Sequence, residues 1–492
     1  MKNHTGVSFG AASTTPAALA ASAAPAANEK RKAQYLRALQ KSPRLHRAAL
    51  ALPASRGALE TACSYALAPA LAGFVQWLLD RAVRSGKKRL YFLARDGYFF
   101  YQAALILCKS HGLPLDCRYL SCSRYALRLP LYHLDPQEAL SDICRGGTEV
   151  TLERILRRAG LQEEEVRQVQ DRLAPKLAPA LNSGAPLSQQ YLPEIRRLLA
   201  ACPLFLADMN RRSKEALPGL AGYLRQEGLL QEESAAIVDS GWLGSMQQTL
   251  NQALALLGRK QKLEGYYWGL YDLPAQADPG GYHYYFFSPQ GPLRAKARFN
   301  NCLFEAVFTA PHGMTLSYVL QNGRFAPYYG PISGAKQKAV QTIGAYLMRY
   351  IRLLAAQGRQ HEGPLSLPQE QDFARDRAAI QRLFFLLSAR PTPEEAQALG
   401  SLPFSDDVVE DPHSVLAPLL TEEELKAGHP LRRLLSPPGA GMRASAWYEG
   451  SAVRRGRKAR YHLWQHGLYQ YLRHGAGRYR YIRKRREAKK HG

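Results

Sequence analysis

The stretch Arg89-Leu-Tyr-Phe-Leu-Ala-Arg-Asp-Gly97 decides the fold of this chain. It is a short apolar, aromatic run that is closed by an acid and a glycine, which predicts a buried strand. A helix is expected to follow over 98–110, and a second strand over 117–121. A strand, a helix and another strand in this order predict a parallel sheet.

A second segment has the same layout. Ala236-Ile-Val-Asp-Ser-Gly241 is again an apolar run that ends in an acid and a glycine, and a helix is expected after it over 245–257. An aromatic strand is expected over 263–271. These elements predict an α/β protein with a Rossmann-like, mostly parallel sheet, a helical insertion and a helical C-terminal region.

The pattern divides the chain into six parts. Residues 136–230 are predicted to be a helical insertion, because helical segments separated by Pro and Gly follow one another there. Residues 1–30 are predicted to be a disordered leader, because they contain a run of Ala, Ser, Thr and Pro. The parts are a disordered leader (1–30), the first part of the α/β core (31–135), the helical insertion (136–230), the second part of the core (231–330), a helical and irregular region (331–452) and a basic tail (453–492).

The charge of the chain is its unusual property. With 492 residues, 46% apolar and 22% charged, the composition is that of a globular protein of more than one domain. The net charge is +26, and half of it lies in 454–492, where 14 Lys or Arg accompany one acid, Glu487. A polycation favours a polyanionic partner. We expect the tail to dock on an anionic membrane surface, with nucleic acid as the alternative partner.

The cysteines and the apolar runs bear on where in the cell the protein is expected. Seven cysteines without any CxxC spacing predict reduced thiols rather than disulfides or a zinc site. The longest apolar run, 65–79, has 15 residues and contains Pro69, which predicts a buried helix rather than a membrane span. We therefore expect a cytoplasmic protein that lies peripherally at the inner face of the plasma membrane.

Asp96 and Asp239 each end a predicted strand. Because the carboxyl ends of parallel strands meet at one edge of a sheet and ligands bind there, we expect both carboxylates to face one crevice. They can hold Mg²⁺ there, or act as a base or a nucleophile. A helix cap with a tight turn explains either segment alone equally well, but the pair favours a site.

The residues that follow the predicted strands have the features of a phosphate site. Glycines let the backbone approach a ligand, and a helix N-terminus offers hydroxyls and free N–H groups. Arg124 can hold a phosphate with two hydrogen bonds, although a surface salt bridge also explains it. The residues expected to bind substrate or phosphate are Arg95, Gly97, Tyr98, Ser123, Arg124, Ser240, Gly241, Trp242, Gly244 and Ser245.

Glu305 and His312 are further candidates for acid–base chemistry. Glu305 lies in a predicted apolar helix, and His312 follows it in a turn that contains Pro and Gly. Such a pair can serve as acid and base. A structural ion pair for the Glu and a loop contact for the His are the alternatives.

Five blocks of the sequence carry a resemblance to a known family. They are Leu90-Tyr-Phe-Leu-Ala-Arg-Asp-Gly-Tyr98, Ser123-Arg-Tyr-Ala-Leu-Arg-Leu-Pro130, Ile237-Val-Asp-Ser-Gly-Trp-Leu-Gly-Ser-Met-Gln247, Phe304-Glu-Ala-Val-Phe-Thr-Ala-Pro-His-Gly313 and Trp447-Tyr-Glu-Gly-Ser451. As a set they resemble bacterial proteins described as predicted HAD-superfamily hydrolases, which accompany glycosyltransferases in surface-polysaccharide loci. HAD phosphatases carry Asp-x-Asp after the first strand, whereas Tyr98 takes the second place after Asp96 here. The chain therefore resembles the C-terminal, non-HAD part of that group.

The resemblance implies a phosphosugar or nucleotide-sugar processing enzyme, a hydrolase or a transferase, in bacterial surface-polysaccharide biosynthesis. Its expected partners are a phosphorylated sugar or nucleotide-sugar and glycosyltransferases, with Mg²⁺ as cofactor. The segment 236–245 is also similar in shape to the diphosphosugar loop of phosphoribosyltransferases. Two alternatives stay open: a non-catalytic scaffold for glycosyltransferases at the inner membrane, and a nucleic-acid-binding protein that acts through the basic tail.

Overall fold

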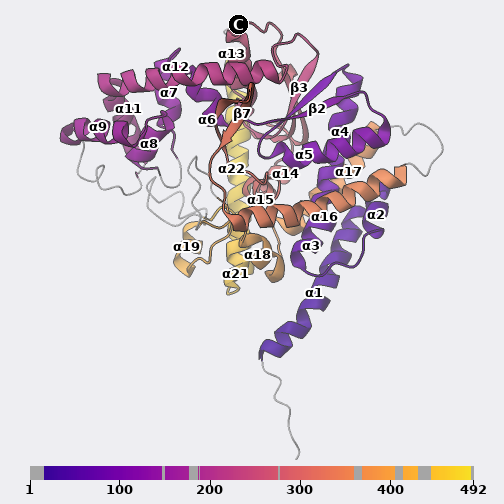
Figure 1. Cartoon of the computed structure of the whole chain (residues 1–492). Helices are drawn as coiled ribbons and strands as arrows, with labels where there is room; N and C mark the ends of the chain where they lie inside the picture. Colours follow the sequence, from indigo (N-terminus) through magenta and orange to yellow (C-terminus); the bar gives the residue numbers. More distant parts are fainter. Residues whose placement is uncertain are drawn as a thin grey trace, which may run out of the picture.

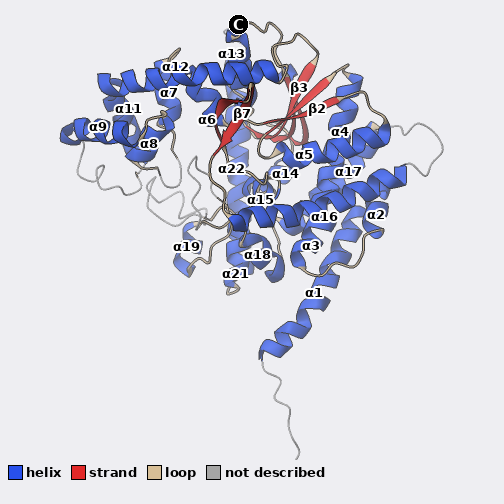
Figure 2. Ribbon diagram, in the orientation of Figure 1, coloured by secondary structure: helices blue, strands red, loops and turns tan. Residues whose placement is uncertain are grey.

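The structure of the protein is a computed structural model, shown in Figures 1 and 2. It describes residues 16–146, 150–176, 187, 189–274, 277–358, 368–404, 414–429 and 445–488. Helices surround one sheet of five parallel strands in the order β2-β1-β3-β4-β5. The strands are β1 (Arg89–Leu93), β2 (Asp116–Leu120), β3 (Ala235–Trp242), β4 (Glu264–Leu270) and β5 (Tyr282–Phe287). The α/β fold class and the Rossmann-like parallel sheet are therefore confirmed.

The inner strands β1, β3 and β4 are buried on both faces, because their residues alternate between two apolar cores, whereas the edge strand β2 is mostly half-buried. Leu90 and Phe92 of β1 point into the larger core, whereas Tyr91 and Leu93 point into the other. Helices close the larger core on one face of the sheet: α4 (Ala68–Arg84), α5 (Gly97–His111), α16 (Gly334–Gly358) and α17 (Glu370–Leu387). On the other face lie α13 (Ser245–Leu256) and the second half of α12 (Pro203–Gln226).

The apolar run that includes residues 65–79 forms the centre of the larger core. Within the described residues, the helical stretch Ala58–Arg84 has the length and composition to cross a membrane, and its most apolar window is completely buried inside the protein. The stretch consists of α3 (Ala58–Ala62), one π-helical turn and α4. The prediction of a buried helix agrees with this position.

The insertion is helical throughout its described part and has a core of its own. Ile155, Val169 and Phe205 are among the residues that fill this core. Figure 1 shows the insertion standing to one side of the sheet. Its helices are α7 (Pro136–Ile143), α8 (Leu152–Arg158), α9 (Glu163–Leu173), α11 (Leu192–Ala200) and the first half of α12. The long helix α12 joins the insertion to the sheet, since Leu220 and Leu224 pack against β-strand residues.

The remaining elements complete the covering of the sheet. An antiparallel hairpin of β6 and β7 packs against α12, and α18 and α21 pack against each other near the larger core. The elements are α1 (Pro16–Leu39), α2 (Pro43–Leu50), α6 (Arg124–Arg128), α14 (Leu293–Ala297), α15 (Asn301–Val307), β6 (Thr315–Gln321), β7 (Arg324–Tyr329), α18 (Pro393–Gly400), α19 (Glu422–Ala427), α21 (Tyr448–Arg455) and α22 (Ala459–Ala488).

The N-terminal part differs from the expected disordered leader. Residues 1–15 lie outside the described residues, but α1 already begins at Pro16, so the second half of the expected leader is helical. The physical reason is composition, because alanine has the highest helix propensity and proline is favoured at the first helical position. The same alanines that make the segment low in complexity make it a good helix.

Candidate functional site

The switch point of the sheet lies between β1 and β3. The chain leaves β1 towards β2 on one side, and the later strands of this sheet, β3, β4 and β5, lie on the other side of β1. Their registers align Phe92 with Val238, so that the two strands end at the same edge. In open α/β sheets, ligands bind in the crevice outside the carboxyl ends at this point. Asp96 and Asp239 both lie there.

Asp96 is the first residue of the candidate site. It stands at the N-terminus of α5 without capping this helix through its side chain. Its Oδ2 instead accepts a hydrogen bond from the Ser240 hydroxyl, which is itself buried. Burial raises the pKa of Asp96, against the lowering effects of the Ser240 hydroxyl, Arg95, Arg124 and Lys336. A capping role would explain Asp96 from its own helix. Its side chain instead links the end of β1 to Ser240 of β3.

Asp239 is the second carboxylate, and only 8% of it is exposed. Burial and the negative charge of Asp96 raise the pKa of Asp239 to about 7, against hydrogen bonds from the Ser240 and Gly241 amides and the charge of Arg124. The two acids are therefore close enough to interact directly. A carboxyl group with a pKa near neutrality can both hold and release a proton under physiological conditions.

Three cations accompany the two acids. Their charges lower the pKa of Asp96, which places Arg95, Arg124 and Lys336 around it. Arg124 is an exposed residue at the start of α6, just after β2, whereas Lys336 belongs to α16 and is buried. We call Asp96, Asp239, Arg95, Arg124, Lys336 and Ser240 the switch-point cluster. Its formal charge of three cations against two acids suits an anionic ligand.

His312 forms a second polar group close by. Its Nδ1 donates to the Gly313 carbonyl at 2.8 Å, so its Nε2 accepts from the Tyr119 hydroxyl, also at 2.8 Å. Burial lowers the pKa of His312, and the charge of Arg95 lowers it further, so the ring is neutral at pH 7. Tyr98 packs edge-on against Tyr119 with ring centroids 5.6 Å apart. Tyr119 of β2 thus contacts both Tyr98 and His312, and Arg95 of the cluster is close enough to His312 to affect its pKa.

Ser123 and Glu305 have structural partners. The Ser123 hydroxyl accepts from the Ala126 amide at 2.9 Å, which caps α6, and donates to the Thr315 carbonyl at 2.7 Å. The Glu305 carboxylate accepts a hydrogen bond from the indole of Trp242. A Ser before a helix and a Glu in an apolar helix look the same in sequence whether they bind a ligand or a neighbouring segment. These contacts favour the structural alternative for both residues.

The turn after Ser240 is shaped by close packing. Gly241 has φ +112°, and a Cβ there would lie 2.3 Å from the Gly269 carbonyl oxygen of β4. Trp242 is left-handed with φ 68°, and its ring packs among the larger core's aromatic side chains. Gly244, with φ +65°, precedes α13, and Ser245 is the first residue of that helix. Among the glycines predicted to bind, Gly97 also has a packing reason, since a Cβ would lie 3.0 Å from the Phe92 backbone.

The described residues contain no group of three or more His, Cys, Asp or Glu side chains that could hold a metal ion. At the switch point, the chain offers two carboxylates, so a magnesium ion would need its other oxygen ligands from water or from a bound phosphate. Comparisons of the sequence with protein-family models and with curated proteins found no match. The evidence on function is therefore the geometry of the switch-point cluster.

Proposed function

We propose that the switch-point cluster binds the phosphate of a phosphorylated sugar or a nucleotide-sugar, and that the chain processes this ligand as a hydrolase or transferase in bacterial surface-polysaccharide biosynthesis. The observation that carries the proposal is the surplus of cations around two buried acids at the sheet's switch point. A buried acid pair with raised pKa values destabilises a fold, and such groups gather at functional sites. The resemblance of the five sequence blocks supports the sugar class.

Each group has a distinct role in this proposal. Arg124 is exposed at the start of α6, where its guanidinium can reach a phosphate with two hydrogen bonds. Lys336 and Arg95 add positive charge close to Asp96. Asp239 is the proton carrier, because its pKa of about 7 lets it donate to a leaving oxygen or accept from an attacking one. Asp96 keeps Ser240 in place between the strands.

Magnesium fits this arrangement as a companion of the ligand. Asp96 and Asp239 are the residues that would hold it, with phosphate oxygens and water as the other ligands. The ion would supply charge neutralisation at the phosphate. Arg124 and Lys336 supply the same kind of charge without it, so phosphate binding in our proposal does not depend on the metal.

Calorimetric titration of the full chain tests the binding step, with inorganic phosphate, glucose 1-phosphate and UDP-glucose as probes. We expect a sugar ligand to bind, and the double variant Arg124→Gln/Lys336→Gln to weaken binding at least tenfold, since each charged hydrogen bond contributes on the order of 1.5–3 kcal/mol. Arg167→Gln, an exposed arginine of α9, is the matched control. Equal binding by all variants, or no binding of any probe, would contradict the proposal.

A second measurement distinguishes the proposal of an enzyme from the alternative of a non-catalytic scaffold. Asp239→Asn removes the proton carrier and leaves the surface of the protein unchanged. If the chain is an enzyme, a strain that carries this variant loses polysaccharide output although the protein folds normally. Normal output from a folded Asp96→Asn/Asp239→Asn variant would instead favour the non-catalytic scaffold for glycosyltransferases.

A further inference from the structure

Within the basic tail, residues Ala459–Ala488 form one long helix, α22, that packs against the body. α22 has 30 residues, and at 1.5 Å per residue it is about 45 Å long. His462 is completely buried and contacts His429 at 2.9 Å, and His466 contacts Glu449 at 3.0 Å. Tyr481, near the other end, is also buried. Figure 1 shows the helix running through most of the height of the molecule from α21 to the C-terminus. The helix is therefore fixed in orientation.

The opposite side of α22 is apolar and exposed. We call this set the outer stripe: it consists of Tyr461, Trp464, Leu468, Leu472 and Tyr479, with 48%, 64%, 45%, 55% and 66% of their surfaces exposed. Their spacings of three, four, four and seven residues follow the helical repeat. At 3.6 residues per turn they fall within a sector of about 80°, turned away from the buried histidines.

An exposed stripe of this kind needs an explanation. Single apolar side chains on a surface are normal, but a continuous row of Trp, Tyr and Leu marks an interaction site. The helix already packs against the body through another face, and within the part of the chain that the structure describes the outer stripe stays exposed. The five side chains of the outer stripe therefore form an apolar surface that faces away from the body of the protein.

Positive charge flanks the outer stripe. α22 carries eight Lys or Arg and one acid. By the helical repeat, Arg460 and Arg478 lie on one flank of the stripe and Arg483 lies on the other, and all three side chains are exposed. An apolar row between two cationic flanks has the form of a helix that lies in a membrane interface, where Trp and Tyr sit at the headgroup level.

We propose that the outer stripe of α22 docks this protein flat on an anionic lipid bilayer, with Trp464, Leu468 and Leu472 inserted among the headgroups. The three flanking arginines pair with the lipid phosphates and acidic headgroups. Nucleic acid fits less well, because the centre of the exposed face is leucine, which gains nothing from a phosphate backbone. The inference is independent of the proposed enzyme, since it uses no residue of the switch-point cluster.

Vesicle flotation tests the proposal with two compositions, phosphatidylcholine alone and phosphatidylcholine with about one third phosphatidylglycerol. We expect binding to the anionic vesicles only, weakened by salt. Trp464→Ser/Leu468→Ser/Leu472→Ser should lower the partition coefficient more than tenfold, since insertion of three large side chains is lost. Arg460→Gln/Arg478→Gln should lower it roughly 25-fold, at about fivefold for each cation.

Matched controls keep the test specific. Leu134→Ser/Leu419→Ser removes two leucines that are 52% and 63% exposed elsewhere, and Arg167→Gln/Arg375→Gln removes two exposed arginines. Both controls should bind vesicles as the wild type does, and circular dichroism should show all variants folded. Equal binding to neutral vesicles, or unchanged binding by the stripe variant, would overturn the proposal. So would a wild-type dimer that the stripe variant abolishes, or RNA binding that outcompetes the vesicles.

Discussion

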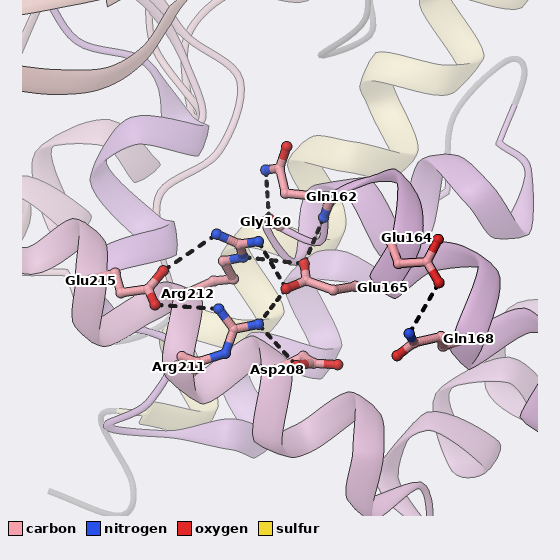
Figure 3. Close-up of polar contacts among 9 residues, drawn as sticks. All are labelled: Gly160, Gln162, Glu164, Glu165, Gln168, Asp208, Arg211, Arg212 and Glu215. Carbon is pink, nitrogen blue, oxygen red and sulfur yellow. Dashed lines mark hydrogen bonds and ion pairs between the residues drawn. The ribbon is translucent and has the colours of Figure 1, made fainter.

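The switch-point cluster and the ion-pair cluster of the helical insertion contain the same kinds of residues and behave in opposite ways. In the insertion, Glu165 of α9 meets Arg211 and Arg212 of α12 (Figure 3). Arg212 binds both oxygens of this carboxylate, at 2.8 and 3.1 Å. Burial alone would raise the pKa of Glu165, but hydrogen bonds from Arg212, the Gln162 amide and Arg211 lower it.

At the switch point, the pKa values of both acids move the other way. Burial raises the pKa of Asp96, and burial together with Asp96 raises that of Asp239. Lowered acid pKa values report charges that stabilise the folded state, whereas raised values report charges that destabilise it. The comparison teaches that the insertion's charges hold α9 and α12 together, whereas the acids at the switch point are charged at a cost to the fold, as we expect of the proposed ligand site.

Asp239→Asn gives the largest expected effect on stability. Asparagine removes the buried charge and keeps an oxygen for the backbone amides. With a folded pKa of about 7 and an unfolded pKa near 4, ionisation of Asp239 destabilises the wild type, and this penalty grows from about pH 4 and is complete above pH 7. We expect the variant to raise the free energy of unfolding by on the order of 2–4 kcal/mol at pH 8, and by little at pH 4.5, in urea titrations.

Asp171→Asn is the control for this substitution. Asp171 is exposed on α9, so the same change of charge there should leave the free energy of unfolding within about 0.5 kcal/mol of the wild type at both pH values. A less stable Asp239→Asn protein at pH 8 would mean that the carboxylate stabilises the fold. The distinction between the two clusters would then fail.

Glu165→Gln should lower the free energy of unfolding, whereas Asp239→Asn should raise it. Among the described residues, Glu165→Gln leaves the two arginines with Asp208 and Glu215 as acidic partners, at 3.0 Å or more. We expect a loss of about 1–2 kcal/mol at pH 7, because hydrogen bonds to a carboxylate that is 13% exposed are lost. Since the pKa of Glu165 is lowered, its contribution is present above about pH 4.3 and disappears as the pH falls through its folded pKa. Faster amide hydrogen exchange in α9 and α12 would locate the effect, and unchanged exchange would contradict it.

Much of the fold could be predicted because its determinants are local in sequence. β1 and β3 are apolar runs bounded by turns, and the expected helix over 98–110 matches α5 closely. Both predicted strands end beside each other because parallel strands with intervening helices leave few alternatives. The helix from Pro16 was missed because alanine-rich composition suits disorder and helix alike.

The site could be predicted only in part, because side-chain partners depend on tertiary packing. The two aspartates carried a local signal, namely an acid and a small residue at the end of an apolar run. Lys336 carried none, since it lies in a helix about 240 residues after Asp96 and reaches the site only when α16 packs beside α5. In the same way, nothing in the sequence shows that Ser123 caps a helix and donates to the Thr315 carbonyl.

The smallest expected effect belongs to Glu164, the neighbour of Glu165 on α9. Glu164 accepts a hydrogen bond from Gln168 at 3.1 Å (Figure 3). It also pairs with Arg167 at 3.0 Å, but both charged side chains are about two-thirds exposed. Glu164→Gln makes the same chemical change as Glu165→Gln one position away, and we expect the free energy of unfolding to fall by less than about 0.5 kcal/mol at pH 7. Urea titration of both variants in parallel measures the difference. If Glu164→Gln lost as much stability as Glu165→Gln, the negative charges would act on the N-terminus of α9. The hydrogen bonds of Glu165 with Arg211 and Arg212 would then not be the source of the stability.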